Sequence, residues 1–192
     1  MGNNYRVASM FAGIGGNDLA FLMAGAKIVW ANEFDKHACT TYKLNFGDQH
    51  LVQGDIRKIN VNQIPDFDIL TAGFPCQAFS IAGYKKGFND DRGNLFFDII
   101  RLLKAKHPKA FLLENVKNLV SHDDGRTFRI IIQALKEEGY FPKHDVLSAL
   151  DHGNLPQTRE RTFIVGFTNQ TLTNSFLFPN KIKLEKTIHD II

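Results

Sequence analysis

Short apolar runs, each suited to a buried strand, alternate with helix-like segments along this chain of 192 residues. The first run, "YRVASMF" (5–11), is followed by a glycine turn and then by an apolar segment that suits a helix. The same order recurs, with further strands expected at 27–33, 50–55, 67–73, 110–115 and 161–167, and helices at 17–26, 35–46, 95–106 and 125–140. Strands that alternate with helices predict an α/β fold with a mainly parallel sheet covered on both faces. Ligands of such sheets bind outside the carboxyl ends of the strands.

Composition narrows the class of protein. The length suits one domain with a sizeable core, and no apolar run reaches the roughly 18–20 residues that span a bilayer, so we expect no membrane segment. The two cysteines, Cys39 and Cys76, make no disulfide framework, and no CxxC or HExxH spacing indicates a metal site. With no signal-peptide layout, the simplest location is a reducing cytoplasm. The formal net charge of +3 permits a nucleic-acid partner without requiring one.

The glycine turn "FAGIGG" (11–16) follows the first expected strand, and Glu33 ends the second. Glycine lets the backbone turn tightly and approach a ligand closely. An acid at the end of the second strand can accept hydrogen bonds from ribose hydroxyls. The spacing is G-x-G-G and not the G-x-G-x-x-G of pyrophosphate-binding dehydrogenases. A nucleoside such as S-adenosylmethionine therefore fits better than NAD, with a plain strand-to-helix turn as the alternative. Asp55, after the third strand, is either a turn residue or an acceptor for an adenine amino group.

Cys76 lies in "TAGFPCQAFSIAG" (71–83), just beyond the carboxyl end of the strand expected at 67–73. Pro75 fixes its own backbone dihedral and restricts the residue before it, so Cys76 follows a stiffened turn. Most isolated free cysteines are small buried hydrophobes. A loop at the ligand-binding edge of a sheet is where reactive groups are found. Cys76 is therefore a candidate nucleophile, with a buried structural cysteine as the alternative.

Three charged residues are expected at the same edge of the sheet. Glu114 ends the apolar run of "FLLENV" (111–116), so its carboxyl group should lie near Cys76; a helix-capping acid is the alternative. In "QTRER" (157–161), Arg159 and Arg161 alternate with a glutamate and should point to one face as the chain enters the last strand. Two such arginines suit a phosphate or a carboxylate, and a solvated charge cluster is the alternative.

In this order, the segments resemble the DNA (cytosine-5)-methyltransferases, in particular the small bacterial enzymes of restriction–modification systems. The matching motifs are "FAGIGG", "GFPCQAFS", "DRGNLFFDI", "ENVKN" and "PQTRER", which lie between about residue 5 and residue 168. The resemblance implies the three-layer, Rossmann-like fold of S-adenosylmethionine-dependent methyltransferases, with a mainly parallel sheet and a late antiparallel strand.

The resemblance also implies a role for each matched residue. Cys76 matches the nucleophile, Glu114 the acid that engages N3 of the target cytosine, and Arg159 and Arg161 the arginines that flank the base. The cofactor-binding residues that it implies are Phe11, Gly13, Ile14, Gly15, Gly16, Glu33, Phe34, Asp55, Ile56, Pro75 and Leu95. Gln77, Ser80 and Arg92 correspond to DNA-binding residues.

The implied activity is transfer of a methyl group from S-adenosylmethionine to C5 of a cytosine flipped out of double-stranded DNA, with S-adenosylhomocysteine as the product. Attack of the Cys76 thiolate on C6 activates C5, and no metal is needed. A tRNA cytosine-5 methyltransferase is one alternative, because some relatives act on tRNA. A non-catalytic DNA-binding or regulatory subunit is another, although such a subunit has no use for Cys76 and Glu114 together. An NAD-dependent dehydrogenase is disfavoured by the G-x-G-G spacing.

We expect residues 1–168 to form the catalytic and cofactor-binding domain, and residues 169–192 to connect toward a target-recognition domain. Family members of this type are usually longer, and carry that domain and a late motif that completes the cofactor pocket. The chain is then a piece of a split enzyme, a truncated product, or a sequence given without its remainder. The expected partners are double-stranded DNA and a second polypeptide with the recognition domain and last motifs.

Overall fold

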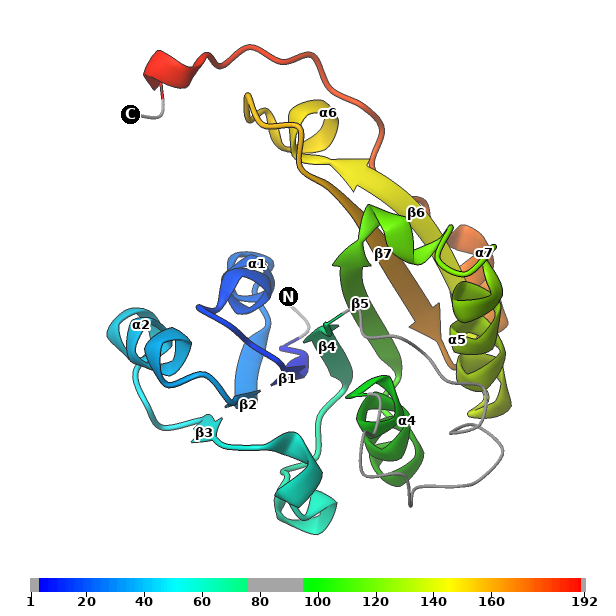
Figure 1. The fold of residues 1–192 in the computed structure, drawn as a ribbon. Coiled ribbons are helices and arrows are strands. Elements are labelled where there is room, and N and C mark those ends of the chain that lie inside the picture. Colours follow the sequence, from blue (N-terminus) through cyan, green and yellow to red (C-terminus); the bar gives the residue numbers. More distant parts are fainter. Residues whose placement is uncertain (1–3, 76–94, 191–192) are drawn as a thin grey trace.

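The computed structural model describes residues 4–75 and 95–190, and its centre is a seven-stranded sheet with α1 and α2 on one face and α4 and α5 on the other (Figure 1). The strands are β1 (Arg6–Met10), β2 (Lys27–Glu33), β3 (Leu51–Gln53), β4 (Ile69–Gly73), β5 (Ala110–Val116), β6 (Phe141–Ser148) and β7 (Glu160–Phe167). The helices are α1 (Gly16–Met23), α2 (Lys36–Phe46), α4 (Leu95–Lys106), α5 (Arg126–Glu137), α6 (Ala149–Gly153) and α7 (Gln170–Ser175). The 3₁₀ turns are η1 (Ile56–Lys58), η2 (Val61–Gln63), η3 (Lys117–Leu119) and η4 (Ile188–Asp190).

The strand order is β3-β2-β1-β4-β5-β7-β6. The first five strands pair in parallel, and β7 runs antiparallel to both β5 and β6. This topology confirms the predicted α/β fold with its late antiparallel strand. From β1 the chain builds β2 and β3 on one side and then β4 and β5 on the other. The strand order therefore reverses at the β1–β4 pair, which is where open sheets of this kind bind their ligands.

Strand β6 is not predicted by the sequence pattern, because it is an edge strand with polar residues. It contains Pro142, which is tolerated at a sheet edge because proline has no N–H to donate. The outer edge is also protected by local hydrogen bonds: the Val146 N–H donates to Asp145 Oδ1 (2.8 Å) and the Ser148 N–H to His152 Nδ1 (3.2 Å). Such satisfied edge groups oppose pairing with another chain.

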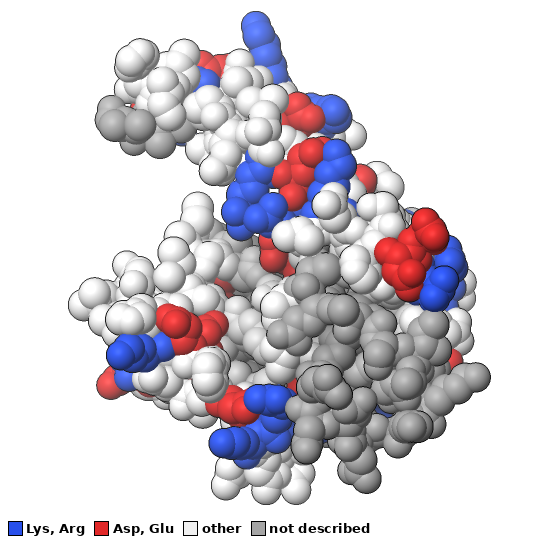
Figure 2. Space-filling view, viewed as in Figure 1, with Lys and Arg blue, Asp and Glu red and all other residues white. Residues whose placement is uncertain are grey.

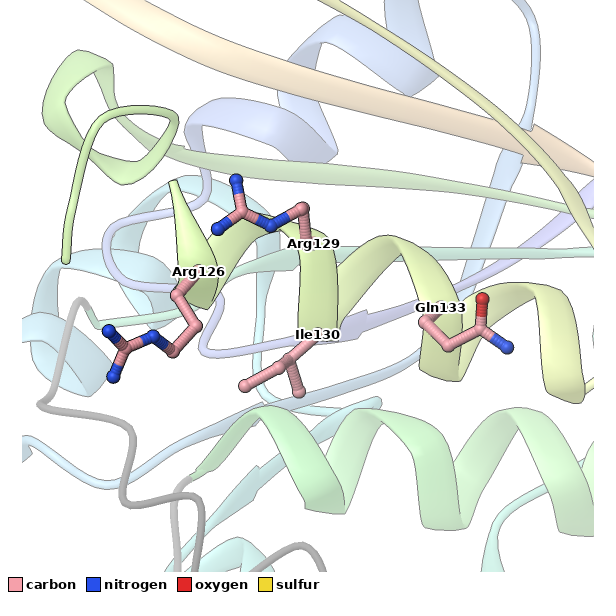
Figure 3. A pocket seen from close by; sticks show the side chains of 4 residues that line it. All are labelled: Arg126, Arg129, Ile130 and Gln133. Atoms are coloured by element: carbon pink, nitrogen blue, oxygen red, sulfur yellow. The ribbon is translucent and has the colours of Figure 1, made fainter. Parts of the chain in front are cut away.

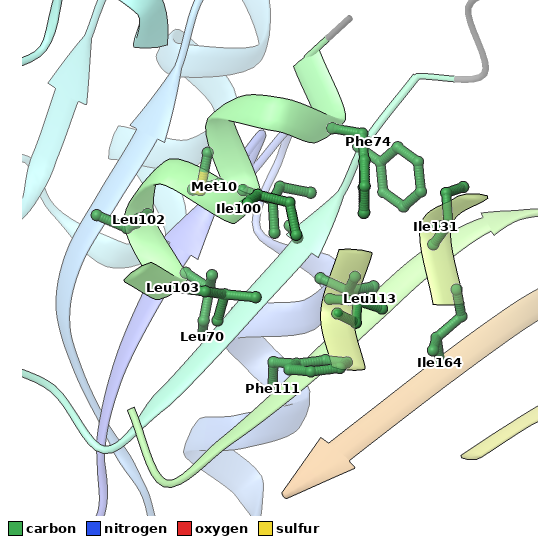
Figure 4. Packing of buried hydrophobic residues seen from close by; sticks show 14 of the residues in the cluster. Met10, Leu70, Phe74, Ile100, Leu102, Leu103, Phe111, Leu113, Ile131 and Ile164 are labelled. Carbon is green, nitrogen blue, oxygen red and sulfur yellow. The ribbon is translucent and has the colours of Figure 1, made fainter. Parts of the chain in front are cut away.

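The main hydrophobic core lies between the sheet and the helices α4 and α5 (Figure 4). Along β5, Phe111 and Leu113 are buried and Leu112 between them is half-buried, which is the alternation expected of a strand. Leu70 of β4 and Ile131 of α5 complete the packing around them. The core therefore holds β4 and β5 side by side, and their carboxyl ends meet at one edge.

The last part of the described chain packs against the antiparallel side of the sheet. Phe176, after α7, contacts Phe167 of β7 with ring centroids 5.7 Å apart, and its carbonyl accepts a hydrogen bond from Lys143 Nζ (2.9 Å). Farther along, Lys181 pairs with Asp151 of α6 (2.9 Å). In Figure 1, α6 and this terminal segment stand apart from the layered body. Among the described helices, none is long and apolar enough to cross a membrane.

A buried hydrogen bond ties α1 to α2. Asp18 is the one buried residue of α1, and its Oδ2 accepts a hydrogen bond of 2.6 Å from the hydroxyl of buried Tyr42 in α2. Burial raises the pKa of the Asp18 carboxyl, and the Tyr42 hydroxyl opposes that rise. Phe46, one turn after Tyr42, packs against Gly15, where any Cβ would collide with its ring. The α1–α2 contact thus supports the glycine turn from beneath.

Replacing Tyr42 by phenylalanine should lower the free energy of unfolding by about 1–3 kcal/mol, because the Asp18 carboxylate loses a donor. Loss of the hydroxyl raises the pKa of Asp18 further above its unfolded value. The folded state then binds more protons than the unfolded state between those two values, so stability falls as the pH rises through that window. The destabilisation by Y42F should therefore grow with pH. Urea unfolding of both proteins over a range of pH measures it.

Tyr140→Phe is the matched control, because the Tyr140 hydroxyl donates to a buried carbonyl, that of Pro108 (2.8 Å), and not to a carboxylate. The loss in free energy of unfolding caused by Y140F should stay constant across the same pH range. Equal pH dependence of the two variants would contradict the account of Asp18.

Candidate cofactor and active site

The carboxyl ends of β1, β2, β4 and β5 meet at one edge of the sheet, and most of the predicted site residues that the structure describes lie there. The first group surrounds the glycine turn after β1. Phe11, Gly13 and Gly15 all have positive φ, at 54°, 57° and 94°. Such angles suit glycine and cost energy at Phe11, so the turn has a special backbone path.

Glu33 holds this turn to the end of β2. Its Oε2 accepts the Gly13 N–H, and its Oε1 accepts the N–H groups of Phe34 and Asp35, each at 2.8 Å. A carboxylate offers about four acceptor positions. Donors among the described residues fill three of those of Glu33, which leaves one for a ligand hydroxyl. The sequence-based interpretation of a plain turn does not account for an acid anchored in this way.

The surface beside Glu33 is open and partly apolar. A Cβ added at Gly13 or Gly16 would meet no atom within 4 Å, and the side chains of Ile14 and Phe34 are 60% and 73% exposed. An exposed aromatic ring and an aliphatic group next to a ribose-type acceptor fit a nucleoside. These residues therefore fit S-adenosylmethionine.

Asp55 lies at the next strand end and makes the contacts of a turn residue. Its Oδ1 accepts the N–H of Arg57, which caps η1, and its carboxylate pairs with the Arg57 guanidinium, with Nη2 2.7 Å from Oδ2. The guanidinium hydrogen bond lowers the pKa of Asp55. Asn32 fixes the chain before it, because its Nδ2 donates to the carbonyls of Val52 and Gly54 (both 2.9 Å). Sequence reasoning missed Asn32.

Turn η1 is also held from α4. Arg101 donates to the carbonyls of Ile56 (2.8 Å) and Ile59 (3.1 Å) and pairs with Asp98 (3.0 Å). Ile56, expected at the cofactor, is only 3% exposed and packs in the core beneath the turn. Leu95, at the start of α4, is half-buried against the same core.

Glu114 and Arg161 form the second group. Arg161 Nε lies 2.9 Å from Glu114 Oε1, and both side chains are about one quarter exposed (24% and 23%). Glu114 lies opposite Phe163 and Val116 opposite Arg161, so the two charged residues are diagonal neighbours on one face. The helix-cap interpretation of Glu114 is wrong, because the residue lies within β5 and η3 has no side-chain cap.

Gly73 joins the two groups. It pairs with Glu114 across β4 and β5, and a Cβ added to it would lie 3.3 Å from Glu114 Oε2 and 4.0 Å from the carbonyl oxygen of Phe11. A side chain here would therefore press on the carboxylate. The absence of a side chain lets the glycine turn of β1 and the carboxylate of β5 approach each other.

Beyond Gly73, the chain is fixed by a residue that sequence reasoning missed. Asn115 is 2% exposed, and its Nδ2 donates to the carbonyl of Phe74 (2.9 Å). The Phe74 ring also contacts Phe96 of α4 at 5.7 Å between centroids. Pro75 is exposed. The predicted residues Cys76, Gln77, Ser80 and Arg92 lie outside the described residues.

Arg159 does not join Arg161 in the strand. It precedes β7 and is exposed, whereas Glu160 pairs with Lys117 (2.8 Å). Figure 2 shows basic and acidic side chains gathered where the part of the molecule that stands apart meets the body. Of the two arginines, only Arg161 lies within β7 and pairs with Glu114. That Arg159 shares this face stays a prediction.

Other features of the described chain lie away from this edge. A hollow on the outer surface of α5 is lined by Arg126, Arg129, Ile130 and Gln133, none of which is a predicted site residue (Figure 3). Cys39 is 1% exposed, and burial raises the pKa of its thiol. It therefore has the properties of a structural cysteine. No cluster of metal-ligating side chains occurs among residues 4–75 and 95–190.

Comparisons with known proteins agree with these motifs. The model of the C-5 cytosine-specific DNA methylase family matches residues 5–192. The chain is 52% identical over 189 residues to the Type II methyltransferase M.Bsp6I of Bacillus sp. (97% of this chain, 60% of the relative). It is 46% identical over 187 residues to M.HhaI of Haemophilus parahaemolyticus (97% and 56%).

Two solved structures are similar in fold. S. pombe Dnmt2 methyltransferase has a TM-score of 0.69 and 26% identity, covering 97% of this chain and 54% of that one. A putative DNA modification methyltransferase from an E. coli prophage has a TM-score of 0.70 and 27% identity, covering 88% and 48%. The chain thus spans only about half to three fifths of the length of these relatives. Its fold, its ordered motifs and the family match together show that the chain belongs to the C-5 cytosine-specific DNA methylase family.

Proposed function

We propose that this chain carries the catalytic machinery for transfer of a methyl group to C5 of a flipped-out cytosine in double-stranded DNA. The observation that carries the proposal is the Glu114 carboxylate, paired with Arg161 at the sheet edge from which the chain continues through Phe74 to Cys76. An acid held there can contact the cytosine ring that the thiolate attacks. The family description and the names of the Type II relatives support DNA as the substrate.

S-adenosylmethionine is the proposed methyl donor, and when bound it supplies an electrophilic methyl group. Glu33 would accept hydrogen bonds from its ribose, and Phe34 and Ile14 would pack against its apolar parts, with the glycine turn giving close backbone approach. The exposed side chains of Phe34 and Ile14 and the fourth acceptor position of Glu33 support this assignment.

The proposed chemistry needs a nucleophile and charge stabilisation. The Cys76 thiolate forms a bond to C6 of cytosine, which makes C5 nucleophilic enough to take the methyl group. Glu114, oriented by Arg161, donates a hydrogen bond from its carboxyl O–H to N3, which offsets the negative charge that develops in the ring. Loss of the C5 proton and cleavage of the S–C6 bond release the methylated base. Arg159, exposed before β7, would contact the cytosine carbonyl or a neighbouring phosphate.

Pro75 and Leu95 would border the cofactor, and Gln77, Ser80 and Arg92 would contact DNA. Because the chain spans only part of its relatives, we propose that target recognition needs a further segment, on this or a second polypeptide, and that residues 169–192 lead toward it. The two Type II methyltransferases named above, M.Bsp6I and M.HhaI, are bacterial, which supports a location in the bacterial cytoplasm.

Covalent capture tests the function. Duplex DNA containing 5-fluorocytosine should form a denaturation-resistant adduct with the chain and S-adenosylmethionine, because the fluorine cannot leave as a proton does. The reaction is run with and without a polypeptide carrying the part of M.HhaI that this chain does not match. C76S should abolish the adduct, and E114Q should slow its formation by about 10²–10³-fold. Gel electrophoresis measures both.

Cys39→Ala is the matched control, since Cys39 is the other cysteine and is buried; its adduct should form as in the wild type. A C76S protein that still forms the adduct, or no adduct under either condition, would contradict the proposal. Preferential capture of tRNA containing 5-fluorocytosine would show that the substrate is RNA and not DNA.

Asn115 should affect the same reaction through the backbone. N115A removes the hydrogen bond to the Phe74 carbonyl, and we expect the capture rate to fall by about ten- to a hundredfold because the chain before Cys76 is no longer fixed. Y140F also removes one buried hydrogen bond to a carbonyl, far from the site, and should lower stability without slowing capture. Equal capture rates for N115A and Y140F would show that Asn115 is only structural.

A further inference from the structure

We propose that Arg57 is a positioning residue for the cofactor: it holds the Asp55 carboxylate so that one oxygen accepts a hydrogen bond from the adenine amino group. The inference rests on the proposed function, and adds to it a residue that sets selectivity for adenine. Asp55 and Arg57 form an ion pair in which the Asp55 side chain is 13% exposed and the Arg57 side chain is 52% exposed.

The Arg57 guanidinium binds the carboxylate as a fork. Nε donates to Oδ1 at 2.9 Å, with a longer contact of 3.1 Å to Oδ2, and Nη2 donates to Oδ2 at 2.7 Å. Two parallel N–H···O bonds fix the plane of a carboxylate as well as its charge. A lysine cannot reproduce this arrangement, because an ammonium is a point charge.

The two carboxylate oxygens differ in what they have left to offer. Oδ1 accepts both the Nε–H and the backbone N–H of Arg57, the latter at 3.0 Å, so its two acceptor positions are used. Oδ2 accepts the Nη2–H and shares the Nε–H with Oδ1. Three N–H groups of the described residues thus occupy the roughly four acceptor positions of the carboxylate, and one position remains on the Oδ2 side. The carboxylate is therefore ionised, fixed in orientation, and able to accept one more hydrogen bond.

The backbone under Asp55 is also fixed, so this orientation is not lost through motion of the turn. Asn32 binds the carbonyl of Gly54 on one side, and Arg101 binds the carbonyl of Ile56 on the other, at 2.9 and 2.8 Å. With the turn held at both ends and Oδ1 bound by the backbone N–H of Arg57, the freedom that remains is rotation of the carboxylate plane. The Arg57 guanidinium restrains that rotation.

One remaining acceptor selects for a donor. The 6-amino group of adenine has an N–H to give, whereas hypoxanthine has an oxygen in that position and would place one acceptor against another. A site that hydrogen-bonds a ligand N–H rejects the analogue without it. Asp55 should therefore distinguish the two bases, and should do so only while Arg57 holds it.

The test compares binding of S-adenosylhomocysteine and S-inosylhomocysteine, with NMR titrations that read affinities to the millimolar range. The wild type should prefer the adenosyl ligand about tenfold, as expected for one hydrogen bond to a charged group at a partly exposed site. R57A should lose most of that preference, because its affinity for S-adenosylhomocysteine falls while its affinity for S-inosylhomocysteine does not. D55N should lose the preference as well, and R57K should recover little of it. R126A is the matched control, because the Arg126 side chain is as exposed as that of Arg57 (51% against 52%), pairs with an aspartate, and lies on α5; it should keep the full preference.

The outcomes separate the two levels of the proposal. Binding of neither ligand by the wild type would contradict the cofactor assignment itself. Binding without a preference in the wild type, or a preference that R57A leaves intact, would overturn the role of Arg57 while the cofactor assignment stands. An equal loss of affinity for both ligands in R57A would show that Arg57 supports only the fold of the turn.

Discussion

In the antiparallel pair of β5 and β7, Glu114 lies opposite Phe163 and Arg161 lies two residues away on the same face. This register is the constraint on which the rest of the site depends. A slip of one residue would turn Glu114 toward the core side, where Leu113 and Asn115 now lie buried. The buried core of β4, β5, α4 and α5 prevents that slip, because it would expose apolar side chains to water. Packing far from the chemistry thus fixes where the carboxylate is.

The two halves of the site are joined by backbone approach. Because Gly73 has no side chain, the carbonyl of Phe11 and the carboxylate of Glu114 both lie close to its Cα. The proposed cofactor site and the proposed cytosine site are therefore adjacent. Buried amides then fix the strand ends: Asn32 at the cofactor side and Asn115 at the side that leads to Cys76. Each donates to backbone carbonyls, which fixes the chain without placing a charge in the site.

Much of this arrangement follows from sequence. The apolar runs predict the parallel strands, and the rule that ligands bind at the carboxyl ends brings Glu33, Asp55 and Glu114 to one edge. Strand β6 is missed because its edge position allows polar residues, and Asn32 and Asn115 because their partners are carbonyls distant in sequence. Local pattern could not separate Arg161 from Arg159, since the start of β7 decides which of them faces Glu114.

The coupling between Glu114 and Arg161 is the most direct test of the account. The rate of covalent capture is measured for the wild type, E114Q, R161A and the double variant, since residues that act as one unit give non-additive losses. If Arg161 acts by holding Glu114, the double variant should be no slower than the slower single variant. Losses that multiply in the double variant would mean that the two residues act independently, and would contradict the central claim.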